Sequence, residues 1–329
     1  MKGNVIVGQS GGPTAAINSS LAGVYRTAKD RGANKVYGML FGIQGLLQER
    51  YIDLSEYITN DLDTELLKRT PAAFLGSCRY KLPEIHENKD VYEKIFSILE
   101  KLDIEAFIYI GGNDSMDTIK KLSDYAIVTG YRTRFIGCPK TIDNDLALTD
   151  HTPGYGSAAK YIGTSVKEII RDSFCLEYGK GLVSIVEIMG RNAGWLTGAA
   201  ALAKGEDCLG PDLIYLPELP FDIEAFSEKV KDLLAKKPSV VVAVSEGIRL
   251  ADGRYVCELG QSVDFVDAFG HKQLSGTANY LASYIAGEFG CKTRAIELST
   301  LQRSASHCDF QSRYSRSLSG RRRGSKSCG

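Results

Sequence analysis

Two aspartates, Asp143 and Asp145, stand two positions apart in the segment GCPKTIDNDLALTD (137–150), beside Lys140 and Thr141. In such a pair, one carboxylate can take a proton from an attacking alcohol while the other supports a magnesium ion, because a general base and a metal ligand must be close but separately oriented. An Asn/Asp-rich turn is the alternative interpretation. Because a lysine, a threonine and two acids crowd one loop, we expect a chemical role.

Two glycine-rich segments follow apolar, β-prone runs, where phosphate-binding turns are often found. The first, GQSGGPTAAIN (8–18), predicts a strand, a glycine turn and a helix start, whose backbone N–H groups and dipole would attract an anion. It matches neither GxGxxG nor a Walker A loop, and a plain tight turn explains it equally well.

The second glycine-rich segment, YIGGNDSMDT (109–118), places Asn, Asp and Ser where phosphate usually sits. The carboxylate of Asp114 therefore restricts which phosphate compound could bind there.

Two charged residues, Arg191 and Glu246, are predicted at strand ends, and three further arginines are candidates for the same site. Arg191 lies in EIMGRNAGWLTG, Glu246 in AVSEGI, Arg79 in FLGSCRY, and Arg294 and Arg303 in TRAIELSTLQRSASH. An arginine at a strand end can grip a sugar phosphate through two parallel hydrogen bonds, and a carboxylate suits a sugar hydroxyl. Each of these residues alone is more often solvated. Together with the aspartate loop they predict a pocket for a bisphosphate.

Strand-like runs that alternate with helical patterns would hold these residues in place. The predicted strands are NVIVGQ (4–9), KVYGML (35–40), AFIYIGG (106–112), RFIGCPK (134–140), LVSIVEIMG (182–190) and VVVAVSEG (240–247). This alternation indicates an α/β fold with mostly parallel sheets, in which ligands sit at the carboxyl ends of strands. The 329 residues suffice for two α/β lobes of ordinary size.

Composition excludes several classes of function. Forty Lys and Arg balance forty Asp and Glu, so overall charge favours neither nucleic acid nor a membrane surface as a partner. No run approaches the roughly 20 apolar residues of a membrane span, and MKGNVIVGQSGG differs from a signal peptide. The sequence therefore predicts a cytoplasmic protein. Eight cysteines without a CxxC pair indicate free thiols, so a bound metal would be held by oxygen.

The composition changes near residue 310. The end of the chain, DFQSRYSRSLSGRRRGSKSCG, consists largely of Arg, Ser and Gly. Such a segment buries too little apolar surface to fold, which predicts a disordered basic tail over 310–329. A tail that binds RNA or a protein partner is a second interpretation.

Six motifs, SGG, GGNDS, PKTIDND, MGR, SEG and LQR, occur in an order that resembles the phosphofructokinase family, specifically its pyrophosphate-dependent branch, over roughly residues 3–308. The resemblance implies magnesium-dependent phosphoryl transfer to the 1-hydroxyl of fructose 6-phosphate. It also implies two Rossmann-like lobes with the active site in the cleft between them. Residues 1–145 would form the pyrophosphate lobe, and 146–309, partly interleaved with it, the sugar-phosphate lobe. A homo-oligomer, either a dimer or a tetramer, is expected.

The resemblance assigns roles residue by residue. Asp143 is the implied general base, with Lys140 and Asp114 as further catalytic residues, and Asn113 and Asp145 as ligands of Mg²⁺. The implied substrate-binding residues are Thr141, Ile142, Asp143, Met189, Gly190, Arg191, Glu246, Arg294, Thr300 and Arg303. The implied donor-binding residues are Gly11, Gly112, Arg79 and Lys140.

The resemblance also indicates which phosphoryl donor is used. ATP-using members of the family carry glycine where Asp114 and Lys140 stand. A carboxylate at position 114 would repel the α-phosphate of a nucleotide, while the ammonium group of Lys140 balances the charge of compact pyrophosphate.

The chain departs from the family pattern at two further positions. Asn113 replaces a common aspartate and should hold Mg²⁺ less tightly. Thr300 stands where relatives have histidine or tyrosine. The family's longer members continue past LQRSASH into a further helical segment, so by this resemblance the change near residue 310 resembles a frameshifted or truncated reading.

Two alternatives remain open. An ATP-dependent 6-phosphofructokinase would be favoured if Asp114 points away from the donor, and a non-catalytic regulatory or binding subunit is motivated by Asn113 and by the change near residue 310.

Overall fold

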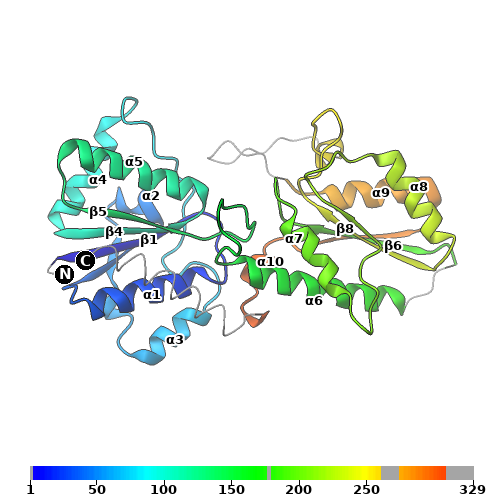
Figure 1. Cartoon of the computed structure of the whole chain (residues 1–329), viewed down its shortest axis with the longest axis horizontal. Helices are drawn as coiled ribbons and strands as arrows, with labels where there is room; N and C mark the ends of the chain where they lie inside the picture. The colour runs from blue at the N-terminus through cyan, green and yellow to red at the C-terminus, as the bar shows by residue number, and fades with distance from the viewer. Residues whose placement is uncertain (1–2, 176–178, 261–273, 309–329) are drawn as a thin grey trace.

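The computed structural model describes residues 3–175, 179–260 and 274–308 and divides them between two sheets (Figure 1). The first sheet has the strand order β3-β2-β1-β4-β5. Its strands are β1 (Asn4–Gln9), β2 (Val36–Met39), β3 (Tyr51–Asp53), β4 (Ile104–Gly111) and β5 (Arg134–Pro139). All neighbours pair in parallel except β2 and β3, which are antiparallel.

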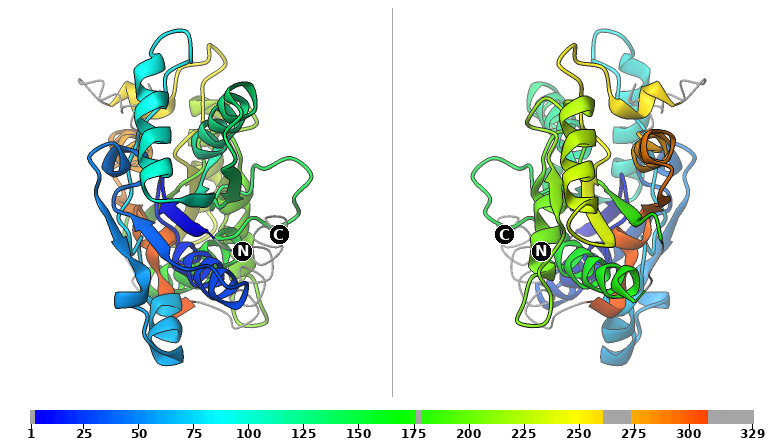
Figure 2. Two further views of the ribbon diagram at one scale, coloured as in Figure 1. Left: turned by 90° about the vertical axis from the view of Figure 1, so that its left-hand side faces the viewer. Right: turned by 90° about the vertical axis from the view of Figure 1, so that its right-hand side faces the viewer.

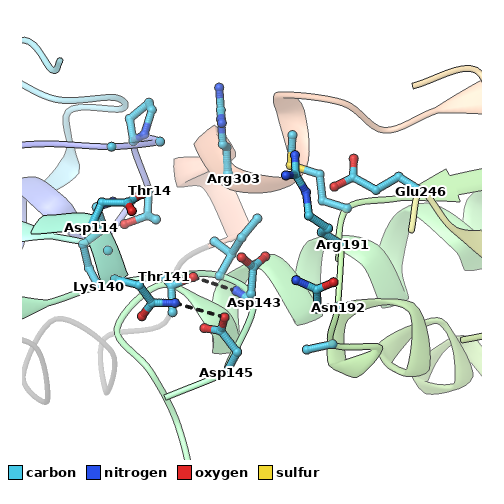
Figure 3. A pocket seen from close by; sticks show the side chains of 18 of the residues that line it. Thr14, Asp114, Lys140, Thr141, Asp143, Asp145, Arg191, Asn192, Glu246 and Arg303 are labelled. Atoms are coloured by element: carbon cyan, nitrogen blue, oxygen red, sulfur yellow. Dashed lines mark hydrogen bonds between the residues drawn. The ribbon is translucent and has the colours of Figure 1, made fainter. Parts of the chain in front are cut away.

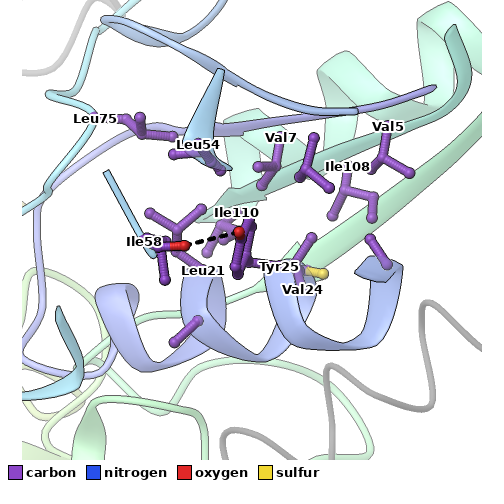
Figure 4. Close-up of a cluster of buried hydrophobic side chains, with 14 of the residues drawn as sticks. Val5, Val7, Leu21, Val24, Tyr25, Leu54, Ile58, Leu75, Ile108 and Ile110 are labelled. Carbon is purple, nitrogen blue, oxygen red and sulfur yellow. Dashed lines mark hydrogen bonds between the residues drawn. The ribbon is translucent and has the colours of Figure 1, made fainter. Parts of the chain in front are cut away.

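Helices cover both faces of this first sheet (Figure 1). They are α1 (Ile17–Asp30), α2 (Gly42–Leu46), α3 (Asp61–Arg69), α4 (Lys89–Lys101) and α5 (Asn113–Thr129), with a 3-10 turn at Leu54–Glu56. One face packs a cluster that includes Val7, Leu21 and Tyr25, whose hydroxyl donates to the carbonyl of Ile58 at 2.9 Å (Figure 4). A second cluster around Phe96 and other buried rings fills the opposite face. Burial on both faces explains why the centre of β1, residues 5–7, is apolar on both sides of the strand.

The second sheet has the order β7-β8-β6-β9, and all its pairs are parallel. Its strands are β6 (Leu182–Ile188), β7 (Leu213–Tyr215), β8 (Ser239–Ser245) and β9 (Lys292–Glu297). Its helices are α6 (Tyr155–Phe174), α7 (Trp195–Gly198), α8 (Ile223–Leu234), α9 (Thr277–Phe289) and α10 (Leu301–Ser304), with 3-10 turns at Ala199–Ala203, Val256–Leu259 and Ser306–Cys308. The end-on views in Figure 2 show each lobe in turn.

The predicted fold class is confirmed, since both lobes are α/β with mostly parallel sheets. The boundary predicted between residues 145 and 146 falls in the connection between β5 and α6. The segment containing α10 lies where the two lobes meet (Figure 1). The predicted tail at 310–329 lies outside the described residues. Within the described ranges, no helix is long and apolar enough to cross a membrane, and the seven cysteines there are free thiols.

Candidate active site

A cavity of about 390 Å³ lies between the carboxyl ends of the two sheets, and Figure 3 shows the side chains around it. The first lobe contributes the turn after β1 and the segments that follow β4 and β5. The second lobe contributes the segments that follow β6 and β8, and Arg303 of α10. The cavity is lined by these predicted residues: Gly11, Arg79, Gly112, Asn113, Asp114, Lys140, Thr141, Ile142, Asp143, Asp145, Met189, Arg191, Glu246 and Arg303.

The glycine turn after β1 makes room for two cations. Gly11 has a φ of +74°, and a Cβ added there would lie 3.1 Å from Nζ of Lys140. A Cβ on Gly12 would lie 2.9 Å from Nη1 of Arg303. The N–H of Gly11 donates to the carbonyl of Cys78 at 3.2 Å. This N–H is therefore bonded within the protein, and what the turn offers at Gly11 is space beside Lys140; the binding of a phosphoryl donor by Gly11 stays a prediction.

Helix α5 begins directly at the cavity. Gly112 is its N-cap and Asn113 and Asp114 are its first two residues. The first N–H groups of a helix and its dipole favour an anion at this position. A Cβ on Gly111 would fall 1.9 Å from Oγ of Ser115, so the close turn from β4 into α5 requires glycine. The start of the helix favours a bound anion, but the carboxylate of Asp114 places a negative charge at the same position. The two effects therefore oppose each other.

The aspartate loop is held in shape by its own hydrogen bonds. The N–H of Asp143 donates to Oγ1 of Thr141 at 3.1 Å. Asn144, in the left-handed region at φ +57°, donates to the carbonyl of Asp150 at 3.1 Å and accepts from the N–H of Thr152 at 2.9 Å. These contacts leave the side chains of Asp143 and Asp145 lining the cavity on either side of a braced residue.

Asp143 has the electrostatic environment of a general base. Burial raises its pKa above the usual aspartate value, and the neighbouring charge of Asp145 raises it further. A hydrogen bond from Thr141 and the charges of Lys140 and Arg191 act in the opposite direction. Lys140 is itself only 3% exposed. An elevated pKa strengthens a carboxylate as a proton acceptor.

The second lobe presents a backbone turn and a carboxylate. Gly190 has a φ of +141°, and its N–H donates to Oε1 of Glu246 at 3.3 Å. Oγ of Ser245 donates to the carbonyl of Gly190 at 2.5 Å. Burial raises the pKa of Glu246 to about 7, a shift that this N–H partly opposes. These two hydrogen bonds connect the segment after β6 to the end of β8 and to Glu246. They place Met189 and Arg191 next to Glu246 at the cavity.

Arg303 connects the lobes from α10. Its carbonyl accepts from the N–H of Ala15 at 2.9 Å, beside the glycine turn of the first lobe. Burial lowers the pKa of its guanidinium, and the charge of Arg79 lowers it further. Two arginines close enough to affect each other would be stabilised by an anion between them.

Three predicted substrate residues are not among the side chains that line this cavity. Gly190 contributes backbone contacts only, as described above. Arg294 lies in the first half of β9, away from its carboxyl end, and forms an ion pair with Asp172 of α6 at 2.6 Å. Thr300 is the N-cap of α10, and its carbonyl accepts from Oγ of Ser304 at 2.8 Å. Arg294 and Thr300 therefore do not line the cavity with the other predicted residues, and their roles in substrate binding stay predictions.

Five further residues line the cavity: Gly12, Pro13, Thr14, Asn192 and Ala193. The first three lie in the predicted anion-binding turn at 8–18, although no individual role was assigned to them. Asn192 and Ala193 were not predicted, and their position directly after Arg191 was the only signal for them in the sequence.

Gln302 was missed as well. It is 2% exposed, and its Oε1 accepts from the N–H of Met189 at 3.1 Å. Gln302 is the middle residue of the motif LQR, but no role was assigned to it from the sequence.

Oxygen atoms that suit a hard cation occur at one edge of the cavity. Nδ2 of Asn113 donates to Oδ2 of Asp145 at 3.4 Å. If the amide group of Asn113 rotated, its Oδ1 would face Asp145, and the two side chains could bind one ion. No group of three or more His, Cys, Asp or Glu side chains that could hold a metal occurs in the described part of the chain. Mg²⁺ is commonly bound by one or two carboxylates plus substrate phosphates. The donor set therefore fits magnesium bound together with a phosphate compound.

The fold and the cavity define a two-lobed α/β protein with a cationic and acidic site for phosphate compounds in its cleft. The phosphofructokinase family model matches residues 4–319, and the chain belongs to the phosphofructokinase family. It is 43% identical over 305 residues to the pyrophosphate–fructose 6-phosphate 1-phosphotransferase of Xanthomonas campestris pv. campestris, covering 93% of this chain and 72% of that protein.

Two further comparisons agree with this family membership. The protein of the same name from Rhodospirillum rubrum is 42% identical over 313 residues, covering 93% of this chain and 74% of the relative. The crystal structure of pyrophosphate-dependent phosphofructokinase from Nitrosospira multiformis superimposes with a TM-score of 0.85 at 32% identity. That superposition covers 99% of this chain and 76% of the solved one.

Proposed function

We propose that this chain is a diphosphate–fructose-6-phosphate 1-phosphotransferase. It would transfer a phosphoryl group reversibly from pyrophosphate to the 1-hydroxyl of fructose 6-phosphate, giving fructose 1,6-bisphosphate and phosphate. The observation that carries the proposal is the position of Asp143 in the cavity. It has Lys140 and Asp114 of the first lobe on one side, and Arg191 and Glu246 of the second lobe on the other (Figure 3).

Asp143 would act as the general base. Its carboxylate accepts the proton of the 1-hydroxyl as that oxygen attacks phosphorus, and the bond to the leaving phosphate breaks. Asp143 has its N–H bound to Thr141, and a base held in place removes part of the orientational cost of the reaction. Proton acceptance by an aspartate is expected to contribute two to four powers of ten in rate.

The first lobe would bind the donor. The ammonium group of Lys140, which lies against Gly11, and the first N–H groups of α5 offset negative charge on the transferred group. Asp114 disfavours the longer polyphosphate of ATP by charge repulsion. Asn113 and Asp145 would hold Mg²⁺, which when bound neutralises charge on the phosphoryl oxygens.

The second lobe would bind the sugar phosphate. Glu246 accepts from sugar hydroxyls, and Met189, Gly190 and Arg191 form the wall of that subsite. Arg303 supplies positive charge for the 6-phosphate.

Pyrophosphate and the sugar bisphosphate have similar phosphoryl-transfer potentials, so we infer that the reaction serves both glycolysis and gluconeogenesis. We further propose a cytoplasmic homo-oligomer, a dimer or a tetramer, with lobes at 1–145 and 146–309.

The full chain can test this proposal directly. Fructose 1,6-bisphosphate formation would be measured with Mg²⁺ and either pyrophosphate or ATP, and the reverse reaction as pyrophosphate formation from phosphate. We expect turnover in both directions with pyrophosphate and little with ATP. Preference for ATP would instead favour the ATP-dependent alternative. Binding of fructose 6-phosphate without turnover from either donor would favour the non-catalytic subunit, for which Asn113 is the motivating residue.

A further inference from the structure

Asn192, which follows Arg191 directly, has a contact that fixes the direction of its amide group. The side chain lines the cavity and is exposed to solvent. Its Oδ1 accepts a hydrogen bond from Nη2 of Arg249 at 2.9 Å. Neither the sequence motifs nor the roles assigned above use this residue.

The identity of the partner determines which end of the amide faces the cavity. A guanidinium group can only donate hydrogen bonds, so the asparagine atom that meets Arg249 must be the oxygen. The NH₂ group then lies on the opposite side. In Figure 3 the amide nitrogen of Asn192 lies on the side of Asp143 and the oxygen is turned away. Within residues 3–175, 179–260 and 274–308, that nitrogen has no protein acceptor.

Arg249 is itself held in position. Its Nη2 also donates to the hydroxyl of Tyr255 at 2.6 Å, and its guanidinium lies 4.4 Å from the centre of the Tyr255 ring. The two residues are joined by an antiparallel backbone bridge as well. A donor held in advance by such contacts loses less conformational freedom when a ligand binds.

The position of Asn192 selects the ligand. It belongs to the wall formed by Met189, Arg191 and Glu246, which is the sugar side under the proposed function, whereas the donor side is built from the first lobe. Asp143 and Glu246 on this side are acceptors, so an N–H donor next to them complements the acceptor oxygens of a sugar phosphate. We propose that Asn192 is a substrate-contacting residue whose Nδ2 group donates to an oxygen of the sugar phosphate, with Arg249 and Tyr255 orienting the amide.

This inference rests on the proposed function, and calorimetry on the full chain separates the two. Fructose 6-phosphate and magnesium pyrophosphate would be titrated separately into the unaltered protein and into Asn192→Ala. We expect fructose 6-phosphate to bind roughly two- to tenfold more weakly to the variant, the range for one lost hydrogen bond, with pyrophosphate affinity unchanged. If the unaltered protein binds neither ligand, the proposed function and this inference both fail. If Asn192→Ala binds fructose 6-phosphate normally, or weakens both ligands equally, only this inference fails.

A double-mutant cycle tests the role of Arg249. Arg249→Met keeps an apolar stem over the Tyr255 ring and removes the hydrogen bond to Asn192. It should weaken fructose 6-phosphate binding by less than Asn192→Ala does, because the amide can still donate after reorienting. In the Asn192→Ala background it should have no further effect, since the group it orients is absent. Independent, multiplicative effects of the two changes would contradict an orienting role.

Discussion

The side chain of Gln302 and the backbone of Met189 join the two segments that would bind the sugar phosphate. Oε1 of Gln302 accepts from the N–H of Met189 at 3.1 Å, and its Nε2 donates to the carbonyl of Ser299 at 3.0 Å. Arg303, the next residue, bonds the first lobe through Ala15. One short helix, α10, thus contacts both sides of the cleft, and Gln302 holds it against the end of β6.

Gln302→Met should loosen this connection. The change preserves side-chain length but leaves the N–H of Met189 without its acceptor. The cost for a fully buried group is about 1–3 kcal/mol, and because this hydrogen bond is only partly buried, we expect a loss of about 1 kcal/mol. The KM for fructose 6-phosphate should rise more than the KM for pyrophosphate. Urea unfolding and steady-state kinetics measure both effects. Gln44→Met, at an exposed position of α2, is the matched control, and equal behaviour of the two variants would contradict a positioning role for Gln302.

Gly12→Ala should reduce sugar-phosphate binding without unfolding the protein. The added Cβ would lie 2.9 Å from Nη1 of Arg303, and because this is the end of a flexible side chain, the guanidinium can move away. We expect a higher KM for fructose 6-phosphate and a melting temperature close to that of the unaltered chain. Gly156→Ala in α6, where an added Cβ meets nothing within 4 Å, should leave KM unchanged. Unaltered kinetics in Gly12→Ala would show that Arg303 does not bind the substrate from its present position.

Asp143→Asn should lower kcat by about two to four powers of ten with little change in fructose 6-phosphate binding, because the amide cannot accept the proton. In the unaltered enzyme the base must be deprotonated, so turnover should fall as pH drops through the raised pKa of Asp143. That fall should begin at a higher pH than an ordinary aspartate would give. Asp150→Asn, at an exposed position of the same loop, is the control. Near-normal turnover of Asp143→Asn would rule out its role as the base.

Asp114→Gly should raise the ratio of the ATP to the pyrophosphate specificity constant, because a repulsive charge is removed from the start of α5. Adding Lys140→Gly should raise the ratio further by weakening pyrophosphate use. Initial rates with each donor at fixed fructose 6-phosphate provide the ratio. An unchanged ratio in Asp114→Gly, together with ready use of ATP by the unaltered protein, would make the ATP-dependent alternative the better interpretation.

Glu187→Gln should change how stability depends on pH. Glu187 is 5% exposed in β6, and its Oε2 accepts from the N–H of Ala278 at the start of α9 at 2.8 Å. Burial raises the pKa of Glu187 to about 7.

The sign of this effect follows from the raised pKa. Folding favours the protonated acid, so its stabilising contribution is full below the unfolded pKa near 4.5 and is lost as pH rises through about 7. The loss is at most about 3 kcal/mol. Urea unfolding between pH 4.5 and 8 should show this decline in the unaltered chain and a flatter profile in Glu187→Gln. Parallel profiles would mean that Glu187 titrates normally.

Sequence patterns alone determined the central strands and the polar loops that follow them. The run NVIVGQ became β1 with the predicted limits, because its apolar centre at residues 5–7 is typical of a strand buried on both faces. The group Lys140, Thr141, Asp143 and Asp145 was predictable as one site because its members are neighbours in the chain. The edge strand β9, KTRAIE, escaped prediction because its charged, partly exposed residues lack an apolar run.

Only the tertiary structure decided which distant residues meet. Arg294 and Arg303 are nine positions apart and looked equivalent in sequence, yet one pairs with Asp172 and the other lines the cavity. The difference arises because Arg294 lies in the first half of β9 whereas Arg303 lies beyond its carboxyl end. The contacts of Asn192 with Arg249 and of Gln302 with Met189 also join residues far apart in the chain. Such pairings depend on strand order and on how helices pack, and a single sequence carries no local signal for either.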